Sequence, residues 1–115
     1  MNRIRPVMDE LIGIEDSDNL MSEVLGILQD TAVIPDIGKI YTFEYRPKTP
    51  NLRYDANPVV AVTDLFRWGF RGINFHWGEA RQYTWQDVIG TLHYVDNEEL
   101  NDILALPIQN FRLNS

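Results

Sequence analysis

The first third of the chain places its hydrophobic residues at helical spacing. Residues 6–13 predict a short helix that ends near Gly13. Its apolar face would consist of Val7, Met8, Leu11 and Ile12. Residues 16–19 can cap a second helix, whose apolar positions are Leu20, Met21, Val24, Leu25 and Leu28. Pro35 ends this region, so residues 1–36 are expected to form an N-terminal helical arm.

The pattern then changes to one typical of strands. Residues 40–45 alternate and are rich in aromatic and β-branched side chains, which predicts a strand. Residues 47–57 contain two prolines and indicate a long loop. Residues 59–63 and 70–75 predict two further strands, and residues 67–69 can turn the chain between them.

The segment from Thr84 onward predicts helix again. Thr84 and Asp87 have the spacing of a capping box, and the expected apolar stripe is Trp85, Val88, Ile89, Leu92 and Val95. Asn97 can cap a further turn or two, so helices are expected at about residues 84–105. Residues 108–113 alternate and predict a closing strand.

These elements favour an α+β fold. A strand, a long loop and a hairpin in this order are typical of a small SH3-like β-barrel, here with an N-terminal helical segment and a helical insertion before the last strand. Residues 37–115 would form this barrel-like domain, since 115 residues allow one compact unit. Gly72 lies inside the third strand, which indicates a bend or a close approach of backbone.

The formal net charge of −7 is unevenly distributed. Residues 1–36, 37–78 and 79–115 carry net charges of −6, +3 and −4. An acidic protein is repelled by phosphate, which argues against a general nucleic-acid binder. The basic middle segment is still compatible with a local nucleic-acid-binding patch, provided that its cations converge on one face. Those cations are Lys39, Arg46, Lys48, Arg53, Arg67 and Arg71.

Several classes of protein are disfavoured by what the sequence lacks. It has no cysteine, which excludes disulfides and thiolate metal sites and is compatible with a reducing cytosol. No run approaches the roughly 20 apolar residues that span a bilayer. The basic N-terminus is not followed by the apolar core of a secretory signal. We therefore expect no membrane partner.

The sequence shows no catalytic pattern. His76 and His93 are its only histidines, and a zinc site needs more ligands at defined spacing. Ser17 and Ser22 lack the setting of a strained nucleophile turn. Glu98 and Glu99 fit the acidic start of a helix. No glycine-rich phosphate loop is present. We expect no enzyme, no cofactor and no metal.

Aromatic and cationic residues cluster between residues 68 and 85. Aromatic side chains and arginine are enriched at protein–protein hot spots, and they also stack nucleic-acid bases. Core packing is expected to account for half of the cluster or more. The acidic balance favours a protein partner over nucleic acid. The predicted partner-binding residues are Trp68, Arg71, Trp77, Arg81 and Tyr83.

Five short motifs resemble those of a protein family. The run Gly38-Lys39-Ile40-Tyr41-Thr42-Phe43-Glu44-Tyr45 is followed by Pro47-Lys48-Thr49 with Tyr54-Asp55, by Pro58-Val59-Val60, and by Gly72-Ile73-Asn74-Phe75-His76-Trp77. The pattern is similar to small proteins encoded among the virion genes of contractile-tailed bacteriophages, some of which carry the label of DNA-end protector. It covers residues 38–77, about a third of the chain.

The resemblance implies a structural or assembly protein of a tailed-phage virion, made in the host cytoplasm and placed in the tail, baseplate or neck. Its partners would be other virion proteins, contacted in several symmetric copies. The alternative is a nucleic-acid-binding protein that protects or guides packaged DNA ends. A phage-encoded enzyme is a third hypothesis, and it would need a pocket with convergent titratable groups.

Overall fold

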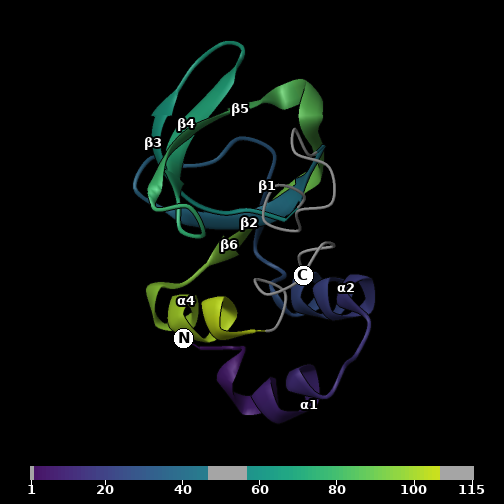
Figure 1. Cartoon of the computed structure of the whole chain (residues 1–115). Coiled ribbons are helices and arrows are strands. Elements are labelled where there is room, and N and C mark those ends of the chain that lie inside the picture. Colours follow the sequence, from purple (N-terminus) through teal and green to yellow (C-terminus); the bar gives the residue numbers. More distant parts are fainter. Residues whose placement is uncertain (1, 47–56, 107–115) are drawn as a thin grey trace.

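The computed structural model describes residues 2–46 and 57–106. This part of the chain has an α+β fold with three α-helices, two short 3₁₀ turns and one antiparallel sheet of six strands (Figure 1). The elements in chain order are η1 (Arg5–Val7), α1 (Met8–Ile12), α2 (Ser17–Ile27), β1 (Thr31–Ala32), β2 (Ile40–Tyr45), β3 (Val59–Leu65), β4 (Gly69–Asn74), β5 (Glu79–Thr84), η2 (Trp85–Asp87), β6 (Val88–Val95) and α4 (Asn97–Ala105).

The sheet is open. Its strand order is β1-β6-β2-β3-β4-β5, with every pair antiparallel and with β1 and β5 at the edges. The predicted α+β class is confirmed. A closed barrel is not observed among residues 2–46 and 57–106, because the two edge strands do not pair with each other.

Two irregularities help to curl the sheet. The register shifts between Thr42 and Glu44 where β2 meets β6, and between Val62 and Asp64 where β3 meets β4. Such bulges bend a strand and increase its twist. The concave side holds an aromatic core of Tyr41, Phe43, Tyr45, Val60, Val62, Phe70, Tyr83 and Leu92. The ring of Phe43 meets that of Tyr83 edge-on, with centroids 5.5 Å apart.

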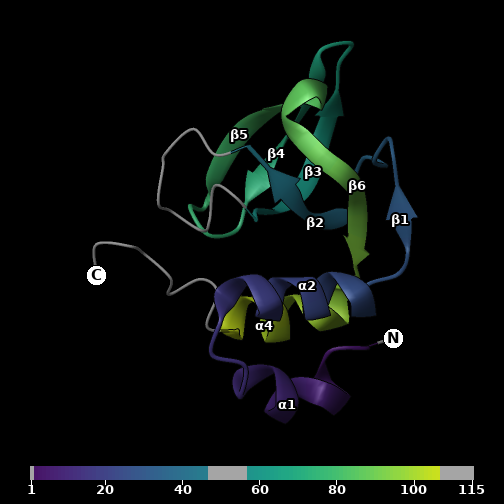
Figure 2. The ribbon, with the colours of Figure 1, turned by 90° about the vertical axis from the view of Figure 1, so that its right-hand side faces the viewer.

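The helices form a separate layer against one end of the sheet (Figure 2). Helices α2 and α4 lie side by side beneath the strands, with α1 below them. The fully buried Leu20 and Val24 of α2, and Leu28 at its C-terminal end, face this second core. The sheet contributes Ile40, Val59 and Val95 to the same cluster. One sheet therefore serves two cores, one inside its curl and one against the helices.

An ion pair closes the helical layer. The carboxylate of Glu99 is fully buried and accepts from the Arg3 guanidinium at 2.9 and 3.0 Å, and from the Arg3 backbone N–H at 2.6 Å. It also completes a capping box at the start of α4, accepting from the Asp96 N–H at 2.9 Å. Burial acts to raise the pKa of Glu99, but these hydrogen bonds outweigh it and lower the pKa below its ordinary value of 4.5.

Several predicted elements are confirmed. Helix α2 follows Asp16, whose carboxylate accepts from the Asn19 N–H as the expected cap. Strands β2, β3 and β4 lie where the alternating pattern placed them, and residues 66–69 turn the chain between β3 and β4. The closing strand expected at residues 108–113 lies outside the described residues.

The helix expected over residues 84–95 is wrong, whereas a helix does form at Asn97–Ala105. The expected capping box does not form: the Thr84 hydroxyl donates to the Asp87 carboxylate at 2.6 Å, its side chain caps no backbone N–H, and only the short 3₁₀ turn η2 follows. The chain then enters β6, which pairs with β2 on one side and with β1 on the other. Sheet pairing and burial of Leu92 and Val95 override the helical spacing.

Replacing Gly72 by Ala should destabilise the sheet. A Cβ there would meet the Val60 side chain and, at 2.5 Å, the Ala61 carbonyl oxygen, so β3 would have to shift. We expect the G72A variant to lose about 2 kcal/mol of unfolding free energy in urea titration. The matched G26A variant in α2 meets nothing within 4 Å and should gain about 0.5 kcal/mol. Equal effects of the two substitutions would contradict the close approach at Gly72.

Removing the Arg3 side chain should leave Glu99 as an unpaired buried carboxylate. We expect Arg3→Gln to cost about 3 kcal/mol in urea unfolding at pH 7. The control Arg5→Gln should cost less than about 1 kcal/mol, because the Arg5 side chain is 73% exposed in its pair with Asp102.

The same pair makes the native state sensitive to acid. A carboxyl with a lowered folded-state pKa stabilises the fold above its ordinary pKa, and this contribution disappears as the pH falls through the lowered value. The wild type should therefore lose stability below about pH 4.5 more steeply than Arg3→Gln does. Parallel acid titrations of the two proteins would contradict this role.

Candidate functional site

An apolar groove lies between the β3–β4 turn and the start of β6. Its volume is about 460 Å³, and it is lined by Val33, Ile34, Leu65, Phe66, Arg67, Trp85, Val88 and Gly90. Three segments distant in the sequence build it: the residues after β1, the β3–β4 turn, and η2 with β6. Gly90 has a φ of 78°, a backbone conformation that favours glycine, at the point where β6 passes the groove.

Several apolar side chains that line the groove are exposed to solvent. Val33 is 76% exposed and Ile34 is 65% exposed, while Leu65 and Phe66 are more than a third exposed. Leaving apolar surface in water costs about 25 cal/mol per Å². Contiguous apolar surface of this kind marks interaction sites in folded proteins. The groove is therefore the candidate site.

The walls of the groove are held rigidly. Trp85 donates from its indole Nε1 to the Arg67 carbonyl oxygen at 3.0 Å, and from its backbone N–H to the Trp68 carbonyl oxygen at 3.1 Å. The Phe66 and Trp68 rings stack with their centroids 4.8 Å apart. The guanidinium of Arg71 lies 5.6 Å from the centre of the Phe66 ring. A partner would meet a preformed aromatic wall, which lowers the entropic cost of binding.

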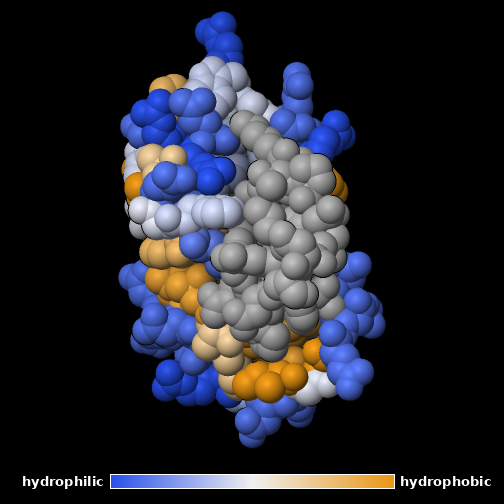
Figure 3. All heavy atoms as spheres, viewed as in Figure 1, coloured by the Kyte–Doolittle hydropathy of each residue, from blue (hydrophilic) through white to orange (hydrophobic). Residues whose placement is uncertain are grey.

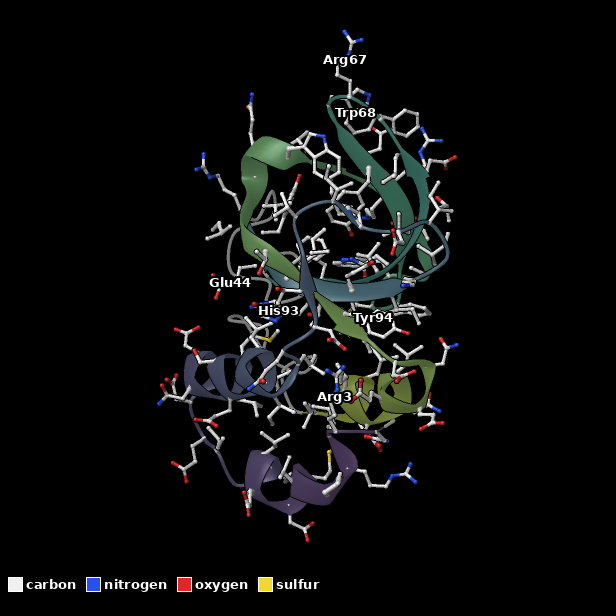
Figure 4. All side chains as sticks on the ribbon, turned by 180° about the vertical axis from the view of Figure 1, so that it is seen from behind. Arg3, Glu44, Arg67, Trp68, His93 and Tyr94 are labelled. Carbon is white, nitrogen blue, oxygen red and sulfur yellow. The ribbon has the colours of Figure 1, made fainter. Side chains whose placement is uncertain are left out.

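The charge at the groove is carried by Arg67. Its side chain is exposed at the tip of the β3–β4 turn and points away from the sheet (Figure 4). Among residues 2–46 and 57–106, no acidic group lies within 4 Å of its guanidinium. The neighbouring Asp64 instead accepts a hydrogen bond from the Thr63 hydroxyl at 3.0 Å. A ligand carboxylate could therefore pair with Arg67 without displacing an existing partner.

The structure separates the predicted partner-binding residues. Trp68 and Arg71 do not line the groove, but both contact the ring of Phe66, which does. Trp77 lies in the turn that follows β4, and Arg81 lies on β5, where it pairs with Gly72. The Arg81 guanidinium covers the Trp77 ring at 5.0 Å and also pairs with Glu79.

Tyr83 offers no surface to a partner. It is 5% exposed, and its ring stacks on Phe70 with centroids 5.2 Å apart. Its hydroxyl accepts from the buried Asn74 side chain at 2.9 Å. Tyr83 therefore belongs to the core, as core packing was expected to claim part of this cluster.

Sequence reasoning missed the side of the groove formed by Val33 and Ile34. The available signal was two adjacent β-branched hydrophobic residues just before Pro35, outside any helical or alternating pattern. Helical spacing predicts Trp85 and Val88 on the stripe of a helix, not beside the β3–β4 turn. Only the folded sheet brings these four residues together.

Two cations of the middle segment are paired with acids in the part of the chain that the structure describes. Lys39 pairs with Asp36 at 3.2 Å, and Arg46 lies 3.9 Å from Asp87. Arg71 covers Phe66, which leaves Arg67 at the turn. Lys48 and Arg53 lie outside the described residues. This arrangement gives no support to a continuous phosphate-binding surface.

Residues 2–46 and 57–106 hold neither a cluster of metal-binding side chains nor a membrane-spanning helix. No group of three or more His, Asp or Glu side chains there lies close enough to hold a metal ion. None of the helices in these residues is both long enough and apolar enough to span a membrane.

A small cavity of about 10 Å³ lies under α2, apart from the groove. It is lined by Met21, Val24, Thr42, Asn57, Val59, His76 and Ile103. The buried Thr42 hydroxyl has no hydrogen-bond partner among the described residues. Burial lowers the pKa of His76 to about 4, so this imidazole is neutral in the native state at pH 7.

Comparisons of the chain with models of protein families, with curated proteins and with solved structures found no match. The site is therefore interpreted from its own geometry.

The half-buried His76 should make stability depend on pH in a defined window. Its folded-state pKa lies below the ordinary value of 6.5, so the unfolded chain binds a proton first as the pH falls. Stability is therefore full above pH 6.5 and decreases toward pH 4. In His76→Gln this decrease should be absent between pH 7 and pH 5, as measured by urea unfolding midpoints. An unchanged slope in that window would show that another group causes it.

Proposed function

We propose that this protein is a structural or assembly component of a tailed-phage virion, in the tail, baseplate or neck, that acts through protein–protein contacts in symmetric copies. The single observation that carries the proposal is the preformed apolar groove with its stacked aromatic wall and Arg67. A rigid apolar centre with arginine and aromatic residues beside it is the usual composition of a protein interface.

The resemblance in residues 38–77 supports the phage assignment. Three of its motifs fall on β2, at the start of β3, and on β4 with the turn that follows, whereas Pro47-Lys48-Thr49 and Tyr54-Asp55 lie outside the described residues. The groove lies beside the turn between β3 and β4. The groove residues Leu65, Phe66 and Arg67 lie between the second and third strand motifs of this segment, not within them.

We further propose that the curled sheet is a variant of the SH3-like barrel. In support, the strands β6-β2-β3-β4-β5 follow one another in the sheet, and the 3₁₀ turn η2 links β5 to β6. The alternative function, protection of packaged DNA ends, lacks a comparable observation because Lys39 and Arg46 lie beside acids.

The proposal can be tested with particles of the phage that encodes the chain. Mass spectrometry of washed virions should find the protein at a fixed ratio to the portal and tail-tube subunits. A phage that carries Ile34→Asp should show a particle yield reduced by at least about tenfold. The reason is that a carboxylate in the groove opposes burial of an apolar partner.

Ile89→Asp is the matched control. Ile89 is 53% exposed, next to Val88 on β6, but it does not line the groove. This variant should assemble normally, and circular dichroism should show both variants folded. Absence of the protein from washed particles would overturn the proposed function. Equal particle yields from the two variants would overturn the role of the groove.

A further inference from the structure

We propose that the groove receives the acidic helical end of a second copy of this chain, so that copies associate head to tail. This inference rests on the proposed function and names the partner at the same site. The acidic end is defined by Asp9, Glu10, Ile12 and Glu15, which lie in α1 and just after it.

The acidic end has the composition that the groove requires. Ile12 is 53% exposed, although sequence periodicity placed it on an apolar helix face. Asp9, Glu10 and Glu15 are exposed around it. Figure 3 shows hydrophobic side chains at the surface of the helical layer, set among hydrophilic ones. An apolar side chain framed by carboxylates can fill an apolar groove that presents Arg67.

The two surfaces lie at opposite ends of the molecule. The β3–β4 turn is at one end and α1 is at the other, in both ribbon views (Figures 1 and 2). A contact between them therefore leaves a groove open on one copy and an acidic end open on the other. Contacts of this heterologous kind continue into rings or filaments rather than stop at a dimer.

Charge favours the head-to-tail contact over the two symmetric contacts, which would join two helical ends or two grooves. Within the described residues, segments 2–30 and 96–106 hold two arginines against eleven acids, whereas segments 31–46 and 57–95 hold five cations and five acids. Two helical ends would repel each other, and two grooves would bring their Arg67 side chains together. Exposed ion pairs contribute little affinity, so the apolar groove supplies affinity and charge supplies orientation.

The experiment uses two variants that each block one surface. The groove variant is I34D/R67E, and the acidic-end variant is E10K/E15K. All four side chains are exposed, so both proteins should fold, as urea unfolding midpoints would verify. In sedimentation equilibrium, the wild type should associate progressively with concentration, while each variant alone should remain monomeric.

Mixing the two variants gives the decisive measurement. A head-to-tail contact pairs the intact groove of one variant with the intact acidic end of the other, so the mixture should form a one-to-one dimer and nothing larger. I89D and E23K are controls and should associate like the wild type. Salt should weaken the association by screening the charged part of the contact.

Two results would overturn the inference. One is a wild type that stays monomeric up to millimolar concentration, and the other is a mixture of the two variants that remains monomeric. Failure here is distinct from failure of the proposed function. If the groove binds a different virion protein, I34D/R67E will be lost from particles while E10K/E15K will still be incorporated.

Discussion

The ion pair between Arg3 and Glu99 is the contact on which the arrangement of this molecule depends. The guanidinium of Arg3 also donates to the Tyr94 carbonyl oxygen at 3.1 Å and lies 3.5 Å from the Asp30 carboxylate. Arg3 therefore connects the N-terminal segment to three others, which are the end of β6, the start of α4 and the residues after α2. A buried carboxylate is tolerated only when its hydrogen bonds are satisfied, so the helices must close around this pair in one arrangement.

Fixing the helical layer leaves the molecule with two unlike ends. The acidic side chains gather at the helices, and the apolar groove forms where β6 passes the β3–β4 turn. The sheet between them is rigid, with an aromatic core inside its curl and an aliphatic core against the helices. A rigid body with different surfaces at its two ends is suited to repeated assembly, because each contact leaves the next one available.

The helix expected over residues 84–95 shows where sequence reasoning fails. Trp85, Val88 and Leu92 fit a helical stripe, and Thr84 and Asp87 have the spacing of a capping box, but their side chains bond only to each other. Apolar residues three and four apart also suit a strand that bends, and Gly90 with its positive φ lies in this strand. Periodicity alone cannot decide between the two, because the decision depends on whether β2 is present to pair with β6.

The sequence by itself determined the local elements: helix α2 with its Asp16 cap, the strands β2 to β4, and the close approach at Gly72. These depend on residues near one another in the chain, so their physical causes can be read from spacing and side-chain type. Only the tertiary structure decided the path of β6, the burial of Tyr83 and the groove. Val33, Phe66 and Trp85 meet there because the sheet curls, and curling depends on pairing between distant strands.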